Sequence, residues 1–242
     1  VASMVSTMRH LMDDIVRQES RKRRSELEVL QSQINPHFLY NTLDSVIWMT
    51  ESGQQKEAIQ MVTSLARLFR ISLSRGKSII PLADELEHAR HYMTIQQMRF
   101  KNKFTTVIEA KPGTGELYTL KLIIQPLLEN AIYHGCASSE DDGMIRVTAY
   151  RDGEDLLIDV EDNGLGMRPE LASSLLDEDR PETRTGGSGI GVRNVHQRVS
   201  LTFGEGYGLT IFSEPDEGTL VRVRLPALSR EEAERCQQGE EL

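Results

Sequence analysis

Cysteine is scarce in this sequence of 242 residues, which contains only Cys136 and Cys236. Two thiols can form neither a disulfide framework nor a cysteine-ligated zinc site, so both kinds of scaffold are excluded. The eight prolines and eighteen glycines are too few and too scattered for a collagen-like or linker-dominated chain. Hydrophobic residues make up 38% and charged residues 27%, which is typical of a soluble globular protein.

Positive charge and long apolar segments are also lacking. The formal net charge is −9, whereas a nucleic-acid surface needs a clustered excess of Lys and Arg, so we expect no nucleic-acid partner. No apolar run approaches the roughly 20 residues that span a bilayer, and no signal peptide is visible. Because the sequence begins with Val1, we expect a fragment whose membrane segment, if there is one, lies upstream. The basic residues between 17 and 24 are either a solvated helix face or a juxtamembrane patch for anionic lipid.

The first 76 residues are predicted to be helical. Residues 3–49 contain no glycine and one proline, and their apolar residues recur at steps of three and four. Ser-Gly at 52–53 breaks this helix, and a second amphipathic helix then runs to a cap at Gly76. Two such helices joined by a short turn form an antiparallel hairpin. A single hairpin exposes apolar surface, so we expect a homodimer with a four-helix bundle.

A third helix is predicted to begin at Pro81 and to run to about Lys103. We interpret His88 and His91 on this helix as a surface pair, because no further metal ligand is in sight. Trp48, in the first helix of the hairpin, is expected to pack inside that hairpin.

After this helix the pattern changes to short segments typical of strands, which are separated by turns that contain glycine. Strands are predicted at 104–110, 144–150, 156–161, 209–212 and 220–225, and helices at 120–134 and 190–202. The fold class is therefore α+β, a helical hairpin followed by an α/β sandwich. We expect a signalling and hairpin region at 1–76, a connecting helix at 77–103, a sandwich domain at 104–228 and a frayed, charged tail at 229–242.

Three segments of the sandwich domain carry chemistry, and the first is residues 125–135. It places Glu129, Asn130 and His134 in an otherwise apolar helix. Asn130 and His134 are four residues apart, so they share one helix face. Buried polar groups need partners, and a metal-bound phosphate chain would supply them. Taken alone, such an Asn is better explained as a hydrogen-bonding residue of the core.

The second segment, residues 161–167, reads Glu-Asp-Asn-Gly-Leu-Gly-Met and follows an apolar strand. Asp-Asn-Gly alone is typical of a simple hairpin turn. Asp162 stands at the strand end, where its carboxylate can accept a hydrogen bond from an exocyclic amino group. Gly166 would let a ligand ring approach the backbone closely.

The third segment, residues 185–194, reads Thr-Gly-Gly-Ser-Gly-Ile-Gly-Val-Arg-Asn and leads into a helix. Its glycines expose successive N–H groups and the helix start adds positive partial charge, so an anionic phosphate is the expected ligand. The segment is not a Walker motif, since no Gly-Lys-Ser/Thr follows, and the glycine spacing differs from the dinucleotide fingerprint.

Together these segments resemble the ATP-binding domain of sensor histidine kinases, within the group that includes gyrase, the Hsp90 chaperone and MutL (the GHKL, or Bergerat, fold). Residues 33–41, Gln-Ile-Asn-Pro-His-Phe-Leu-Tyr-Asn, resemble the phosphoacceptor motif of the LytS/YesM-type sensor histidine kinases. The resemblance covers residues 25–226. It implies the cytoplasmic part of a membrane sensor that uses ATP and Mg²⁺. Its partner would be the receiver domain of a response regulator.

The resemblance also implies a role for each motif residue. His37 would be phosphorylated, since a neutral imidazole is a competent nucleophile near pH 7. Asn130 would hold Mg²⁺, while Glu129 would assist the metal shell or act as a base. Asp162 would bind the adenine amino group. The residues implied to contact the nucleotide are Asn130, His134, Asp162, Gly164, Gly166, Gly187, Gly189, Gly191 and Thr219.

Two positions depart from the pattern of many relatives. The acidic residue that often follows the phosphoacceptor is Phe38 here. Either another group must take the proton of His37, or the imidazole must attack through its already unprotonated nitrogen. The Glu that activates water in ATP-hydrolysing members is replaced by Pro126, which favours transfer over hydrolysis. Asn41 lies one turn after His37 and is expected to position water for dephosphorylation of the partner.

Two prolines and one polar segment are expected to affect the shape and motion of the chain. Pro36 and Pro126 are expected to bend their helices, because proline removes a backbone hydrogen bond. Residues 167–185 have the polar composition of a mobile lid over ATP.

Two alternatives to a kinase stay open at this point: a GHKL ATPase that clamps a dimer, and a nucleotide-binding adaptor without phosphotransfer.

Overall fold

The computed structural model describes residues 36–73, 77–101, 103–136, 143–177 and 190–238. Several expectations fall outside these residues: the helix before Pro36 and the bend at that proline, the cap at Gly76, the phosphate loop with Gly187 and Gly189, and residues 178–185 of the lid.

Two helices form the N-terminal hairpin. Helix α2 (Pro36–Glu51) and helix α3 (Gln55–Ser72) are joined by a turn at Gly53, whose φ of 76° favours glycine. The predicted break between two helices is therefore confirmed. Met61 of α3 is fully buried against the rest of the chain. Large apolar side chains that stay exposed are Tyr40, Leu43, Ile47 and Trp48 on α2, and Ile59 and Val62 on α3.

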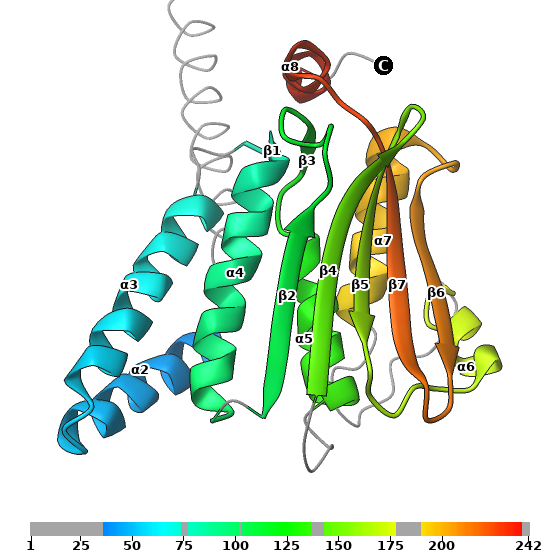
Figure 1. Ribbon diagram of the computed structural model, residues 1–242. Coiled ribbons are helices and arrows are strands. Elements are labelled where there is room, and N and C mark those ends of the chain that lie inside the picture. The colour runs from blue at the N-terminus through cyan, green and yellow to red at the C-terminus, as the bar shows by residue number, and fades with distance from the viewer. Residues whose placement is uncertain (1–35, 74–76, 102, 137–142, 178–189, 239–242) are drawn as a thin grey trace, which may run out of the picture.

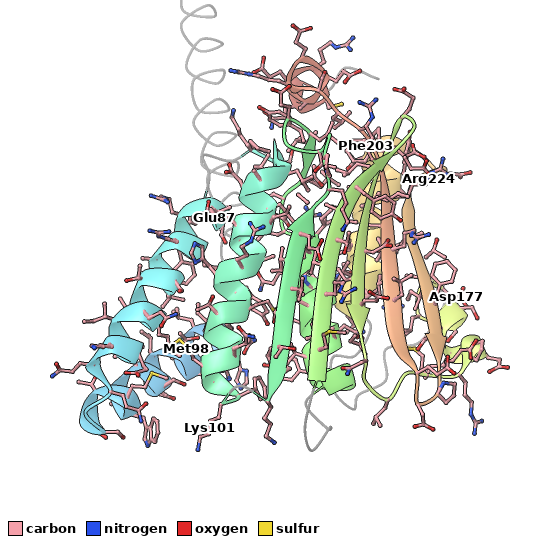
Figure 2. All side chains as sticks on the ribbon, in the orientation of Figure 1. Glu87, Met98, Lys101, Asp177, Phe203 and Arg224 are labelled. Carbon is pink, nitrogen blue, oxygen red and sulfur yellow. The ribbon has the colours of Figure 1, made fainter. Side chains whose placement is uncertain are left out.

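The expected burial of Trp48 is wrong within a single chain, because its side chain is 51% exposed. The Nζ of Lys101 lies 5.8 Å from the centroid of its indole ring, and Figure 2 shows Lys101 just beyond the lower end of α4 (Leu82–Arg99). The indole therefore lies at the surface, with a cation over its ring.

Helix α4 lies between the hairpin and the sheet (Figure 1). It begins directly after Pro81, which belongs to strand β1 (Ile79–Pro81), and it ends at Arg99, short of the predicted end. Its Tyr92 ring packs on the Phe38 ring of α2 with a centroid distance of 5.2 Å. Because α4 contacts neighbours on two sides, polar groups on it are buried and need partners.

The expected surface pair is wrong for His88, which is 0% exposed. Its Nε2 lies 2.9 Å from the hydroxyl of Ser72, at the end of α3. Burial lowers the pKa of His88 to about 4, with smaller contributions from His91 and Lys121, so the ring is neutral at pH 7. The sequence misled here because His88 lies on a helix that is covered from both sides.

Five strands form the main sheet in the order β2-β4-β5-β7-β6 (Figure 1). The first pair is parallel and the other neighbours are antiparallel. The strands are β2 (Phe104–Ala110), β4 (Gly143–Asp152), β5 (Asp155–Asp162), β6 (Gly208–Glu214) and β7 (Gly218–Pro226). All five predicted strands are confirmed. Two further strands, β1 and β3 (Tyr118–Leu120), were not predicted, and they pair with each other in a separate two-stranded sheet.

One face of the main sheet is covered by helices, which lie behind it in Figure 1. They are α5 (Ile124–Asn130), its π-helical continuation η1 (Ala131–Cys136) and α7 (Ile190–Phe203). Fully buried side chains such as Leu128 and Val199 meet Val147, Ile158 and Val223 of the strands in one core. This arrangement confirms the α/β sandwich. A short helix, α6 (Pro169–Ser174), lies beside β6 within the predicted lid.

The expected frayed tail is wrong for residues 230–238, which form helix α8 (Arg230–Gln238). The Ser229 N–H donates to the Glu232 carboxylate at 2.8 Å, and the Glu232 N–H donates to the Ser229 hydroxyl at 3.4 Å. This reciprocal pair is a capping box. Ala233 is 1% exposed and anchors the helix against the domain. In the described part of the chain, no helix combines the length and apolarity needed to cross a bilayer.

Candidate active site

The most strongly constrained part of the site is the end of strand β5, where Asp162 pairs in register with Thr219 of β7. The Asp162 carboxylate accepts hydrogen bonds from the backbone N–H groups of Gly164, at 2.9 Å, and Thr219. Burial raises the pKa of Asp162 to about 6, and the two N–H donors oppose this shift. The group is therefore a carboxylate at neutral pH that is held in a partly desolvated position.

The main chain around Asp162 is packed too tightly for side chains. A Cβ on Gly164 would overlap the backbone of Gly135, and a Cβ on Gly135 would lie 2.6 Å from Oδ1 of Asp162. At Gly166, with φ of 58°, a Cβ would meet the carbonyl oxygens of Glu214 and Gly218. The structure therefore places the two predicted glycines in backbone contacts that fix the loop after Asp162. Gly135 was missed, although it directly ends the Asn-Ala-Ile-Tyr-His run.

A cavity of about 460 Å³ opens beside these residues, between β5, β6, β7 and α6. Asp162 and Thr219 both line it, so the structure brings these two predicted residues together. Ser213 also lines it: its hydroxyl donates to the Gly218 carbonyl and lies 2.9 Å from the hydroxyl of Thr219. The hydroxyl proton of Ser213 is already donated to Gly218, so in the hydrogen bond between the two hydroxyls Thr219 is the donor and Ser213 the acceptor. Ser213 was not predicted, since a lone Ser on a strand carries no signal.

Helix α5 is shorter than predicted and leads directly into the π-helical turn η1. Asn130 is the last residue of α5, and His134 belongs to η1. The regular i,i+4 spacing assumed for this pair therefore does not hold, because a π-helical turn has a different period. The side chain of His134 lies outside the described residues.

The other residues of α5 are also placed by the structure. The expected bend at Pro126 is wrong, because this proline lies in the first turn of α5, where no intrahelical bond is lost. Glu129 is half-buried, and its carboxylate accepts a hydrogen bond from the Gln125 amide at 2.9 Å. Among the described residues that line the cavity beside Asp162, none comes from α5.

The predicted glycine segment is described from its last turn onward. Gly191, in the first turn of α7, approaches α5 so closely that a Cβ would lie 3.2 Å from Cβ of Pro126. The start of α7 therefore lies against the first turn of α5. This contact brings Gly191 next to the helix that ends at Asn130.

His37 lies on the hairpin, in the first turn of α2, and its side chain is exposed. The amide Nδ2 of Asn41 lies 3.2 Å from Nδ1 and 3.2 Å from Nε2 of His37, so the predicted shared face is confirmed. Phe38 is buried against Tyr92 of α4. The residue that replaces an acidic neighbour of His37 therefore attaches α2 to α4.

Comparison with known proteins agrees with this geometry. The histidine kinase family matches residues 25–104, and the family of histidine kinase-, DNA gyrase B- and HSP90-like ATPases matches residues 115–229. The chain belongs to the histidine kinase family. The ATPase-family match covers the sandwich domain, and domains of this family bind ATP.

The curated relatives are sensor histidine kinases. The chain is 39% identical over 223 residues to sensor histidine kinase YesM of Bacillus subtilis, covering 92% of the chain and 37% of the relative. It is 32% identical over 210 residues to sensor histidine kinase BtsS of Escherichia coli, covering 87% and 35%. Sensor protein LytS of B. subtilis is 29% identical over 216 residues, covering 89% and 36%. This histidine kinase chain thus spans little more than a third of the length of these relatives.

Replacing Gly164 by Ala tests the tight main-chain contact of the kinase site. The new Cβ would overlap Gly135, so we expect unfolding free energy to fall by about 1–3 kcal/mol and ATP affinity to fall at least tenfold. Urea unfolding and calorimetric titration with Mg-ATP measure both quantities. Gly115→Ala is the control, since no atom lies within 4 Å of its added Cβ. Equal losses in both variants would contradict the packing argument.

Nucleotide affinity should depend on pH through Asp162, whose pKa is about 6. The carboxylate is the form that accepts a hydrogen bond from an amino group, so binding weakens as pH falls through this pKa. If only the ionised form binds, apparent affinity falls about tenfold between pH 7 and pH 5. Titration of the Asp162→Asn variant with ATP gives the background from ATP itself and from Glu161, Glu214 and Glu217, which line the same cavity. If ATP affinity changed with pH equally in the wild-type chain and in Asp162→Asn, Asp162 would not be the group that causes the pH dependence.

Proposed function

We propose that this chain is the cytoplasmic kinase core of a two-component sensor, in which His37 takes the γ-phosphoryl group of ATP and passes it to an aspartate of a response regulator. The observation that carries the proposal is the combination of two parts in one chain. One is the exposed imidazole of His37 on a helical hairpin; the other is a cavity lined by the buried carboxylate of Asp162.

The adenine end of ATP fits the cavity beside Asp162. The Asp162 carboxylate would accept the hydrogen bond of the exocyclic amino group, and Thr219 with Ser213 would supply hydroxyl groups on the adjoining strands. Gly164 and Gly166 hold the loop that shapes this end, and they leave main chain rather than side chains next to it. The lining combines apolar side chains, such as Ile211 and Leu220, with these polar groups. Apolar contact with polar groups that fix orientation is what a small-molecule site requires.

The phosphate end would lie where α5 and the start of α7 meet. Gly187, Gly189 and Gly191 would present backbone N–H groups there, and His134 would face the phosphates. The amide oxygen of Asn130 is a hard ligand that suits Mg²⁺, with phosphate oxygens and water completing its shell. When bound, Mg²⁺ would neutralise phosphate charge. Glu129, held by Gln125, would assist this shell or act as a base.

Transfer requires His37 to reach the γ-phosphorus. Its unprotonated ring nitrogen forms the bond to phosphorus while the bond to the β,γ-bridging oxygen breaks, and ADP leaves with that electron pair. The second ring nitrogen then releases its proton to water, which is possible because His37 is exposed. This route needs no acidic neighbour, and it accounts for Phe38 at that position. Pro126 offers no base for water, which favours transfer over hydrolysis.

The hairpin supports a homodimer. The apolar side chains Tyr40, Leu43, Ile47 and Trp48 of α2 are between 42% and 67% exposed, and Ile59 and Val62 extend this surface onto α3. A second hairpin would cover them in a four-helix bundle. The receiver domain of the response regulator would dock near His37.

Labelling with γ-phosphate-labelled ATP and Mg²⁺ tests the proposed activity. We expect acid-labile, alkali-stable label on the chain, and its complete loss in His37→Ala, because a phosphoramidate has this stability. His91→Ala, the same substitution outside the phosphoacceptor motif, should keep the label. Free phosphate without labelled protein would indicate an ATPase, and neither product would indicate a nucleotide-binding adaptor.

Asn41 is proposed to promote dephosphorylation of the response regulator. Its amide faces the ring of His37 and, in the complex with a receiver domain, would hold the attacking water near the phosphoaspartate. We expect Asn41→Ala to slow dephosphorylation at least tenfold while leaving ATP affinity unchanged. Ser45→Ala, one turn further along α2, is the control. A wild-type phosphatase rate in Asn41→Ala would refute this role.

A further inference from the structure

The connection between β3 and α5 has an unusual backbone. Leu122 has φ of 58°, a left-handed conformation that a residue with a branched side chain rarely adopts. The side chain of Leu122 is buried, and the first residue before α5, Ile123, supplies no side-chain cap to the helix. A strained turn and an uncapped helix start both need stabilisation from elsewhere in the chain.

That stabilisation comes from Glu85, on α4. One carboxylate oxygen accepts the Leu122 N–H at 2.9 Å, and the other accepts the N–H groups of Ile123 and Ile124 at 2.9 and 3.0 Å. Glu85 is 0% exposed, so these bonds form without competition from water. A carboxylate at a helix N-terminus also interacts favourably with the helix dipole. Glu85 therefore caps α5 from a different helix.

The carbonyl groups of the same turn accept hydrogen bonds from Arg198 of α7. Its guanidinium donates to the Lys121 carbonyl at 2.8 Å and to the Leu122 carbonyl at 3.4 Å. Burial raises the pKa of Glu85, whereas the three N–H groups and the charge of Arg198 lower it. The turn is thus held by two charged side chains, which together form a clamp. The Glu85 carboxylate accepts hydrogen bonds from its N–H groups, and the Arg198 guanidinium donates hydrogen bonds to its carbonyls.

The clamp continues into the hairpin. The Nζ of Lys121 donates to the main-chain carbonyl of Ser72, the last residue of α3, at 2.9 Å. The hydroxyl of Ser72 in turn lies 2.9 Å from His88 of α4, one turn after Glu85. A chain of buried polar contacts therefore connects the end of the hairpin to the start of α5.

We propose that Glu85 is a positioning residue for nucleotide binding: by holding the start of α5 it sets the place of Asn130 at the other end of that short helix. The inference rests on the proposed function, in which Asn130 serves the ATP phosphates. Helix α5 has only seven residues, so a shift or tilt at its first turn is carried to its last residue. Glu85 itself does not line the cavity beside Asp162.

The test compares Glu85→Gln with Glu87→Gln in the full 242-residue chain. Glutamine keeps the shape of Glu85 but replaces one acceptor oxygen by an NH₂ donor, which faces the backbone N–H groups. Glu87 is on the same helix, where Figure 2 shows it beside α3, and its side chain is 45% exposed. We expect Mg-ATP affinity, measured by titration calorimetry, to fall at least tenfold in Glu85→Gln and to stay within twofold in Glu87→Gln.

Calorimetry also separates positioning from loss of folded protein. If Glu85 only stabilised the fold, the substitution would lower the number of binding sites per chain while the folded molecules kept wild-type affinity. A positioning role lowers affinity at an unchanged number of sites. Glu85→Asp keeps a carboxylate on a shorter side chain, and we expect partial recovery of affinity relative to Glu85→Gln.

The possible outcomes are distinct. Wild-type affinity in Glu85→Gln would overturn the inference and leave the proposed function intact, and a reduced number of sites at wild-type affinity would do the same. Should Glu85→Gln fail to fold, Glu85→Asp decides alone: an affinity reduced at least threefold supports the inference, and wild-type affinity overturns it. Failure of the wild-type chain to bind Mg-ATP would instead overturn the proposed function.

Discussion

Burial of α4 on two sides is the constraint on which the rest of the structure depends. Phe38, next to His37, packs on Tyr92 of this helix, and the end of α3 contacts its His88. Glu85 of the same helix holds the start of α5. A rearrangement of the hairpin that keeps these contacts has to move α4, and with it the helix that carries Asn130. The helix that carries His37 and the helix that carries Asn130 are thus connected through α4.

The proposed nucleotide site depends on close main-chain packing. Gly135, Gly164, Gly166 and Gly218 each lie where a Cβ would overlap a neighbouring backbone or the carboxylate of Asp162. This close packing partly buries Asp162, which raises its pKa while two N–H groups keep its orientation. The same contacts that shape the cavity therefore also set the charge state of the residue that would bind adenine.

Much of the fold could be predicted from local patterns. The alternating strands and the break at Gly53 were found because each pattern depends on residues close together in the chain. The two-helix hairpin was predicted correctly, whereas Trp48 on its surface was assigned to the interior. Helix α8 was overlooked although Ser229 and Glu232 have the spacing of a capping box. The three-residue strands β1 and β3 were missed because such short segments have no measurable period.

The sequence by itself determined which chemical groups the proposed site would use, since Asp162, Asn130, His37 and Asn41 stand in motifs whose spacing is local. It also determined the family, through those motifs in their order. Only the tertiary structure decided how the groups are held. Glu85 and Leu122 are 37 residues apart in the chain, and no local pattern pairs a buried carboxylate with a distant helix start. Likewise, the contact between Gly135 and Gly164 exists only once the sheet and its helices are packed together, because it joins two backbones that have no side chains to signal it.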